Sequence, residues 1–65
     1  MDLDTVFRKV AEIALLLDDN EIAHAKEDRL YLDVLKAIAN GCKNPEKLAE
    51  IALTTQNLDF TRWTL

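Results

Sequence analysis

Two side chains with strong potential for chemistry stand out in this sequence, one histidine and one cysteine. His24 is followed by Asp28 four residues later, a spacing that places two candidate metal ligands on one turn of a helix. Cys42 has no second cysteine and no nearby histidine in the sequence. Because a structural zinc site needs four ligands, we expect no metal and no cofactor.

Catalysis needs a nucleophile, a base and an orienting group that meet in a cleft. Cys42 and His24 could supply the first two, but a chain of 65 residues has little material to enclose them together with a substrate. The only glycine, Gly41, leaves no glycine-rich loop to hold a phosphate group. We therefore predict that the protein is not an enzyme.

The composition predicts an all-α fold. Apolar residues make up 49% of the chain and charged residues 31%, which is typical of a globular protein. With one Gly and one Pro there are few turns, and the abundant Ala, Leu, Glu and Lys favour helix. We expect a single domain over residues 1–65, near the lower size limit for independent folding. Its predicted architecture is a small bundle of three helices with an apolar C-terminal tail or a short fourth helix.

Charge and cysteine content restrict the partners and the location. The net charge of −4 disfavours binding to nucleic acid or to an anionic membrane. The longest apolar run, 13–17, is far shorter than the roughly 20 residues that span a bilayer, so we expect no leader and no membrane segment. A single cysteine forms no internal disulfide, and small secreted domains usually need several. The expected location is the cytoplasm.

The first helix is expected to begin at Asp2 or Asp4, either of which could cap it. Leu15 and Leu16 do not fit the apolar stripe of this helix and are predicted to point toward its polar side. The stripe itself recurs at steps of three and four residues and should face the core; it consists of Leu3, Val6, Phe7, Val10, Ile13, Ala14 and Leu17.

The second helix is predicted over about 20–40, with Gly41 as its stop signal. The apolar positions of its second half cover roughly 220° of the circumference, more than one buried stripe requires. Its first half is contradictory, because Glu27 and Asp28 fall on the core side while Ile22 points the opposite way. Two interpretations are open: the helix bends near Glu27, or its first two turns extend past the core and meet something else.

The third helix is expected to start at Asn44 and Pro45, with the asparagine as its cap, and to fade near Thr54 and Thr55. Its buried face is predicted to contain Leu48, Ala49, Ile51 and Ala52.

The segment from Leu58 to Leu65 is unusually apolar for a chain end. Phe60 and Trp63 could close the core or anchor a partner, and the sequence leaves both alternatives open. Arg62 gives the segment an amphipathic character. For Tyr31, the other candidate aromatic anchor, we favour a place in the core.

Surplus apolar side chains are the main argument for function. Beyond one stripe per helix there remain Leu15, Leu16, Ile22, Leu32, Leu53 and the tail. At about 25 cal/mol per Å² of buried apolar area, covering a few of these is comparable to the stability of a chain this short. Soluble monomers seldom leave such patches open. We therefore predict a symmetric homodimer through the broad face of the second helix, with the tail of one chain on its mate.

The preferred function is a small adaptor or inhibitor that occupies a surface of a partner protein. Short, acidic, cofactor-free chains of this style are common among phage and mobile-element proteins that modulate host machinery. The predicted partner-binding residues are Leu15, Leu16, Ile22, Leu32, Phe60, Arg62 and Trp63.

Part of the sequence supports an alternative. Residues 34–41, an apolar helix ending at Gly41, are followed by Pro45 and by Leu48-Ala49 in the next helix. This pattern resembles the first two helices of helix-turn-helix domains. The resemblance covers about 30–52 and implies a DNA-binding transcriptional regulator. Its recognition helix would have to come from 58–65, where Arg62 is the only basic residue.

Overall fold

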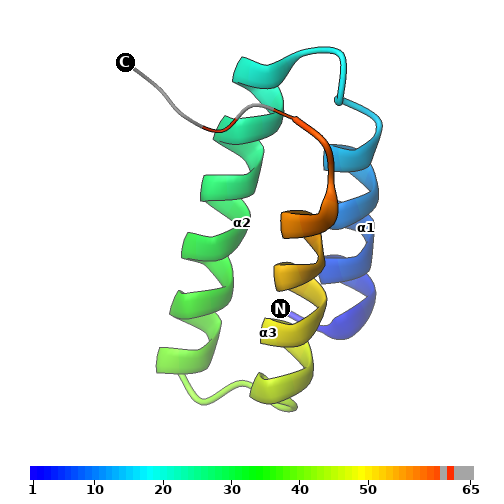
Figure 1. Ribbon diagram of the computed structural model, residues 1–65. Helices are drawn as coiled ribbons and strands as arrows, with labels where there is room; N and C mark the ends of the chain where they lie inside the picture. Colours follow the sequence, from blue (N-terminus) through cyan, green and yellow to red (C-terminus); the bar gives the residue numbers. More distant parts are fainter. Residues whose placement is uncertain (61, 63–65) are drawn as a thin grey trace.

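The computed structural model describes residues 1–60 and Arg62, which form three helices, each antiparallel to the one before it in the chain (Figure 1). The predicted all-α bundle is confirmed, and the described part of the chain contains no strand. No helix within these residues is both long enough and apolar enough to cross a membrane. The elements in chain order are α1 (Leu3–Ala14), α2 (Asn20–Ala39), α3 (Pro45–Leu53) and one 3₁₀ turn, η1 (Thr54–Asn57).

The helix boundaries follow from local chemistry. Asp2 caps α1 by accepting a hydrogen bond from the Thr5 amide at 2.8 Å, and hydrogen bonds from Thr5 lower the pKa of this carboxyl. Asp19 caps α2 through the Ile22 amide at 3.2 Å. After α2 the chain turns through Gly41, whose φ of +78° favours glycine.

The start of α3 differs in one detail from its prediction. Asn44 does precede Pro45, but its side chain makes no capping hydrogen bond. A capping residue normally has an extended backbone, whereas Asn44 is left-handed with φ +55°. Asparagine tolerates this conformation better than most residues, so here it serves the turn and not the cap.

The core lies along the axis of the bundle and takes side chains from all three helices. Its buried apolar members are Val6, Ile13, Ala23, Leu30, Val34, Leu48, Ala52 and Phe60.

Two side chains of the α1 region lie differently from the sequence-based expectation. Phe7 was placed in the buried stripe but is 58% exposed. The buried stripe of α1 is centred on Val6 and Ile13, and Phe7 lies about 100° around the helix from Val6. Leu16 was expected to point outward but is half-buried against the core. Because α1 ends at Ala14, Leu16 belongs to the turn that follows and no longer obeys the helical spacing.

The contradictory first half of α2 has a structural solution. The helix is continuous from Asn20 to Ala39, and Glu27 is only 3% exposed inside it. After η1 the C-terminal segment crosses from α3 toward α2 (Figure 1). The first turns of α2 do not extend past the core, because Ala23 is fully buried in it. Beside Glu27 they are covered by the C-terminal segment of the same chain.

Candidate functional site

An apolar groove runs between α2 and α3. Its volume is about 320 Å³, at the lower end of the range for ligand-sized pockets. Two leucines at its edges reach into solvent: Leu35 is 64% exposed and Leu53 is 50% exposed. We call it the α2–α3 groove; it is lined by Tyr31, Val34, Leu35, Ile38, Ala49, Ala52 and Leu53.

The sequence creates this groove through side-chain size. On α2 the lining positions recur at three- and four-residue steps and carry large side chains such as Leu35 and Ile38. On α3 the facing positions Ala49 and Ala52 are small. Two alanines opposite a row of large side chains leave a hollow that is lined by no charged group.

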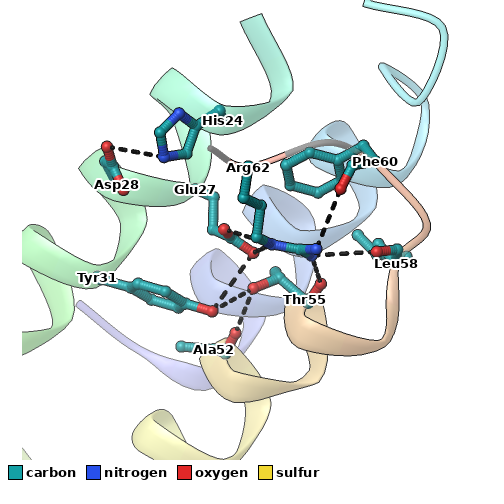
Figure 2. Close-up of polar contacts among 9 residues, drawn as sticks. All are labelled: His24, Glu27, Asp28, Tyr31, Ala52, Thr55, Leu58, Phe60 and Arg62. Atoms are coloured by element: carbon teal, nitrogen blue, oxygen red, sulfur yellow. Dashed lines mark hydrogen bonds and ion pairs between the residues drawn. The ribbon is translucent and has the colours of Figure 1, made fainter. Parts of the chain in front are cut away.

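The seam between α2 and α3 is closed at its other end by a buried ion pair (Figure 2). Arg62 donates from Nε to both carboxylate oxygens of Glu27, at 2.9 and 3.2 Å. The Glu27 side chain is 4% exposed, and that of Arg62 is 33% exposed. The arginine thus supplies the counter-charge that a carboxylate in the core requires.

The remaining donors of Arg62 bind the backbone of the C-terminal segment. Nη2 donates to the carbonyls of Thr55 and Leu58, and Nη1 donates to the carbonyl of Phe60. The guanidinium carbon also lies 3.9 Å from the centre of the Phe60 ring, within the range of a cation–π contact. One side chain therefore holds the turn η1, the segment after it and α2 together.

Tyr31 connects the ion pair with the groove. Its ring lines the groove, while its hydroxyl lies 2.6 Å from Oγ1 of Thr55 and 3.4 Å from Oε2 of Glu27. Thr55 is fully buried, and its hydroxyl also donates to the carbonyl of Ala52 at 3.1 Å. Burial raises the pKa of the Tyr31 phenol; the Glu27 carboxylate acts in the same direction, and the hydrogen bond with Thr55 opposes it.

The residues considered for metal binding or catalysis do not assemble into a site. Nε2 of His24 lies 3.4 Å from Oδ2 of Asp28, and the Asp28 side chain is 67% exposed. Within residues 1–60 and Arg62, no three or more His, Cys, Asp or Glu side chains are grouped to hold a metal ion. Cys42 lies at a hollow of about 480 Å³ between the start of α1 and the α2–α3 loop, and His24 is not among the residues that line it.

The predicted partner-binding residues are not brought together on one face. Leu15, Ile22 and Leu32 are exposed, at 85%, 46% and 44%, but Leu15 belongs to the turn after α1 while Leu32 lies in the middle of α2. Phe60 is buried in the core. Of the two alternatives for this side chain, closing the core or anchoring a partner, the structure supports the first. Trp63 lies outside the described residues.

The structure also gives a different role to some residues and adds others. Arg62, predicted as a partner contact, has its donors bound inside the molecule. Leu35 belongs to the broad apolar arc of the second helix but is not among the predicted partner-binding residues, yet it forms the most exposed edge of the groove. Leu53 is one of the surplus apolar side chains in the sequence, but it is not among the predicted partner-binding residues. The unexplained position of Glu27 was the available signal for the ion pair.

Comparisons of this chain with protein-family models, with curated proteins and with solved structures found no match. The function is therefore argued from the molecule's own features.

Proposed function

We propose that this protein is a small non-enzymatic binding module, an adaptor or inhibitor that acts in the cytoplasm by occupying a surface of a partner protein. One observation carries the proposal: the α2–α3 groove is apolar, open to solvent and edged by the exposed Leu35 and Leu53. An origin in a phage or mobile element belongs to this proposal and rests only on the size and acidic composition of the chain.

The energetics support binding at this groove. Burying a leucine side chain fully contributes about 1.5–3 kcal/mol relative to leaving it in water. Leu35 and Leu53 each retain half or more of their exposure. A partner that covers both, together with the groove floor, would gain several kcal/mol without disturbing the core. Open apolar patches of this kind commonly mark protein interaction sites.

Affinity capture with matched variants tests the proposal. The double variant Leu35→Gln with Leu53→Gln makes both groove edges polar, while Leu15→Gln changes a leucine that is 85% exposed and outside the groove. We expect a partner protein that binds the wild type and the Leu15→Gln protein but not the groove variant. Identical partner sets for all three proteins would refute the groove as the binding site.

A homodimer is the second part of the proposal. Leu32 and Leu35 are three residues apart on α2 and both exposed, so a two-fold pairing of α2 helices would bury four leucines. Sedimentation equilibrium from low micromolar to millimolar concentration tests this. A single monomeric species over the whole range would exclude the dimer and leave binding to a different protein unaffected.

The DNA-binding alternative stays a prediction without a supporting observation. Residues 58–60, where its recognition helix would begin, are not helical. Arg62, the basic residue expected to contact phosphate, is engaged by Glu27. A gel-shift titration of the wild-type protein at low salt decides the question; DNA binding that weakens as salt is added would revive this alternative.

A further inference from the structure

The helix α2 carries a second, mostly apolar stripe on the side that faces away from the core. Its core side is formed by buried residues four, three and four positions apart: Ala23, Glu27, Leu30 and Val34. A further set repeats at steps of three and four residues, and every member of it is exposed. At about 100° per residue, this set lies about 150° around the helix from the core side. We call it the outer stripe; it consists of Ala25, Asp28, Leu32, Leu35 and Ala39.

The spacing of the outer stripe is that of a helix-pairing surface. Alternating steps of three and four residues form the heptad pattern with which two α-helices pack along their length. The stripe keeps this pattern from Ala25 to Ala39, about 21 Å or four turns. Leu32 and Leu35 lie in its middle, and the small alanines at its ends allow a second helix to approach closely. Figure 1 shows α1 and α3 on the other side of α2, so no helix of the described chain covers the stripe.

Charge selects the orientation of a second helix on this stripe. In a parallel pair each residue of the stripe meets its own copy, so two Asp28 carboxylates would face each other. In an antiparallel pair, Leu32 of each helix can lie against Leu35 of the other. The same register sets Asp28 against Ala39, since these lie four residues before and four residues after the two leucines. Asp28 then also lies within one turn of Lys36 of the second copy.

The basic residues beside the outer stripe are compatible with this register. Arg29 is paired with Asp33 of its own chain at 3.3 Å. Lys36 makes no ion pair in the part of the chain that the structure describes, so it is available to Asp28 of the second copy. Each copy carries a net charge of −4, and the stripe has only two large side chains. The pairing should therefore be weak and reversible.

We infer that the outer stripe pairs antiparallel with the outer stripe of a second copy, and that this dimer removes Leu35 from the α2–α3 groove. The inference rests on the proposed function and relates its two parts to each other. Leu35 is 64% exposed in the single chain and belongs both to the stripe and to the edge of the groove. In the dimer, Leu32 of the second copy covers it. A partner protein that binds through Leu35 therefore takes the monomer, and self-association competes with it.

Sedimentation equilibrium of matched variants locates the pairing surface. Leu32 is 44% exposed and lies in the stripe, whereas Ile22 is 46% exposed and lies outside it. We expect Leu32→Gln to weaken dimerisation at least about tenfold, the effect of about 1.4 kcal/mol, and Ile22→Gln to leave it unchanged. Leu53→Gln alters the groove but not the stripe, so it should also dimerise normally. A monomeric wild type, a normal dimer of Leu32→Gln, or loss of the dimer in Leu53→Gln would overturn the inference.

A spin label at the end of α2 reads the orientation of the pair. The exposed Asn40 is replaced by Asn40→Cys in a Cys42→Ser background, and the labelled protein is mixed with isotope-labelled wild type. An antiparallel pair predicts broadened amide signals in residues 21–28 of the isotope-labelled chain. Broadening in residues 36–43 would show a parallel pair, and no broadening would show no pairing at all. Both results contradict the inference.

The covering of Leu35 is measured directly in a mixture of isotope-labelled and unlabelled wild type. Isotope-filtered nuclear Overhauser spectra detect only contacts between two chains. We expect a contact between the methyl groups of Leu35 and Leu32 that disappears on dilution to the monomer. Dimers without this contact would leave Leu35 in the groove and would overturn the inference.

Competition is tested with a protein that the wild type captures and the groove variant Leu35→Gln with Leu53→Gln does not. At concentrations where the wild type alone is dimeric, its complex with this protein should contain one copy of the chain. A complex that retains the dimer would overturn the competition. If no captured protein depends on the groove, the proposed binding at the groove fails, while sedimentation and the two spectroscopic measurements still decide the pairing.

Discussion

The two ends of the seam between α2 and α3 are built on opposite principles. At one end, Glu27, Arg62, Thr55 and the Tyr31 hydroxyl form a set of directional polar contacts covered by the C-terminal segment. At the other end, the groove below the Tyr31 ring has only apolar side chains and lies open. Tyr31 belongs to both, with its hydroxyl in the first and its ring in the second.

The difference shows how one seam can serve both folding and binding. A buried carboxylate is stable only with a well-placed counter-charge, so the closed end accepts a single arrangement of the chain. Apolar contact is not directional, so the open end can accept any side chain of suitable size. We therefore expect substitutions at the closed end to change stability, and substitutions at the open end to change binding.

The largest effect is expected for Arg62→Ala. The substitution leaves the carboxylate of Glu27 buried without its partner, which should lower the free energy of unfolding by about 3 kcal/mol. The whole free energy of unfolding of a chain of 65 residues is only about 3–10 kcal/mol. Urea denaturation followed by circular dichroism measures the loss.

Two control variants allow the effect of Arg62→Ala to be interpreted. Arg29→Ala breaks an ion pair with Asp33 in which the arginine side chain is 69% exposed, so it should change stability by far less than Arg62→Ala, by about 0.5 kcal/mol. Replacing both partners, with Glu27→Leu and Arg62→Met, should cost less than Arg62→Ala because no unpaired charge remains. If Arg62→Ala proves as mild as Arg29→Ala, the closed end does not hold the fold.

Tyr31→Phe should have an intermediate effect. It keeps the ring in the groove but removes the hydroxyl that contacts Thr55 and Glu27. Loss of a partly buried hydrogen bond lowers the free energy of unfolding by about 1 kcal/mol. The same denaturation experiment applies, and binding of the partner protein at the groove should be unchanged. A variant as stable as the wild type would show that the two ends are not linked through this hydroxyl.

The raised pKa of Tyr31 also predicts a loss of stability at high pH. Because the folded state raises the pKa of the phenol above its ordinary value of 10.0, the neutral form is favoured in the folded protein. This contribution is fully present below pH 10 and is lost as the pH rises through the raised pKa. The chain has one tyrosine, so phenolate absorbance follows Tyr31 alone. A midpoint of the phenolate titration at or below pH 10 would contradict the prediction.

The smallest effect on stability is expected at the open end. Leu35→Gln and Leu53→Gln change side chains that are already 64% and 50% exposed, so each should alter the free energy of unfolding by less than about 0.5 kcal/mol. Binding at the groove should nevertheless be lost. A large drop in stability would show that these leucines support the fold and would weaken the distinction between the two ends.

The helices were predictable from the sequence because their signals are local. Asp2 before α1, Gly41 after α2 and Pro45 at the start of α3 act through neighbouring backbone groups, so no knowledge of the fold is needed. Helical spacing identified most of the core in the same way. It failed at Phe7 and Leu16, where the orientation of α1 against its neighbours and the point at which α1 ends decide the exposure.

The site depends on contacts that are distant in sequence. Spacing placed Glu27 on the core side of α2, but its partner Arg62 lies 35 residues further along the chain. Nothing local indicates that pairing. The groove was missed for a related reason: α2 is apolar over a broad arc, and only the positions of α1 and α3 determine that Leu35 stays uncovered.

The position of Arg62 has a consequence for shortened forms of the chain. A cut that removes the residues from Arg62 onward leaves the sequences of α1, α2 and α3 whole but takes away the counter-charge of Glu27. Such a form should lose about as much stability as the Arg62→Ala protein, although it keeps all three helices.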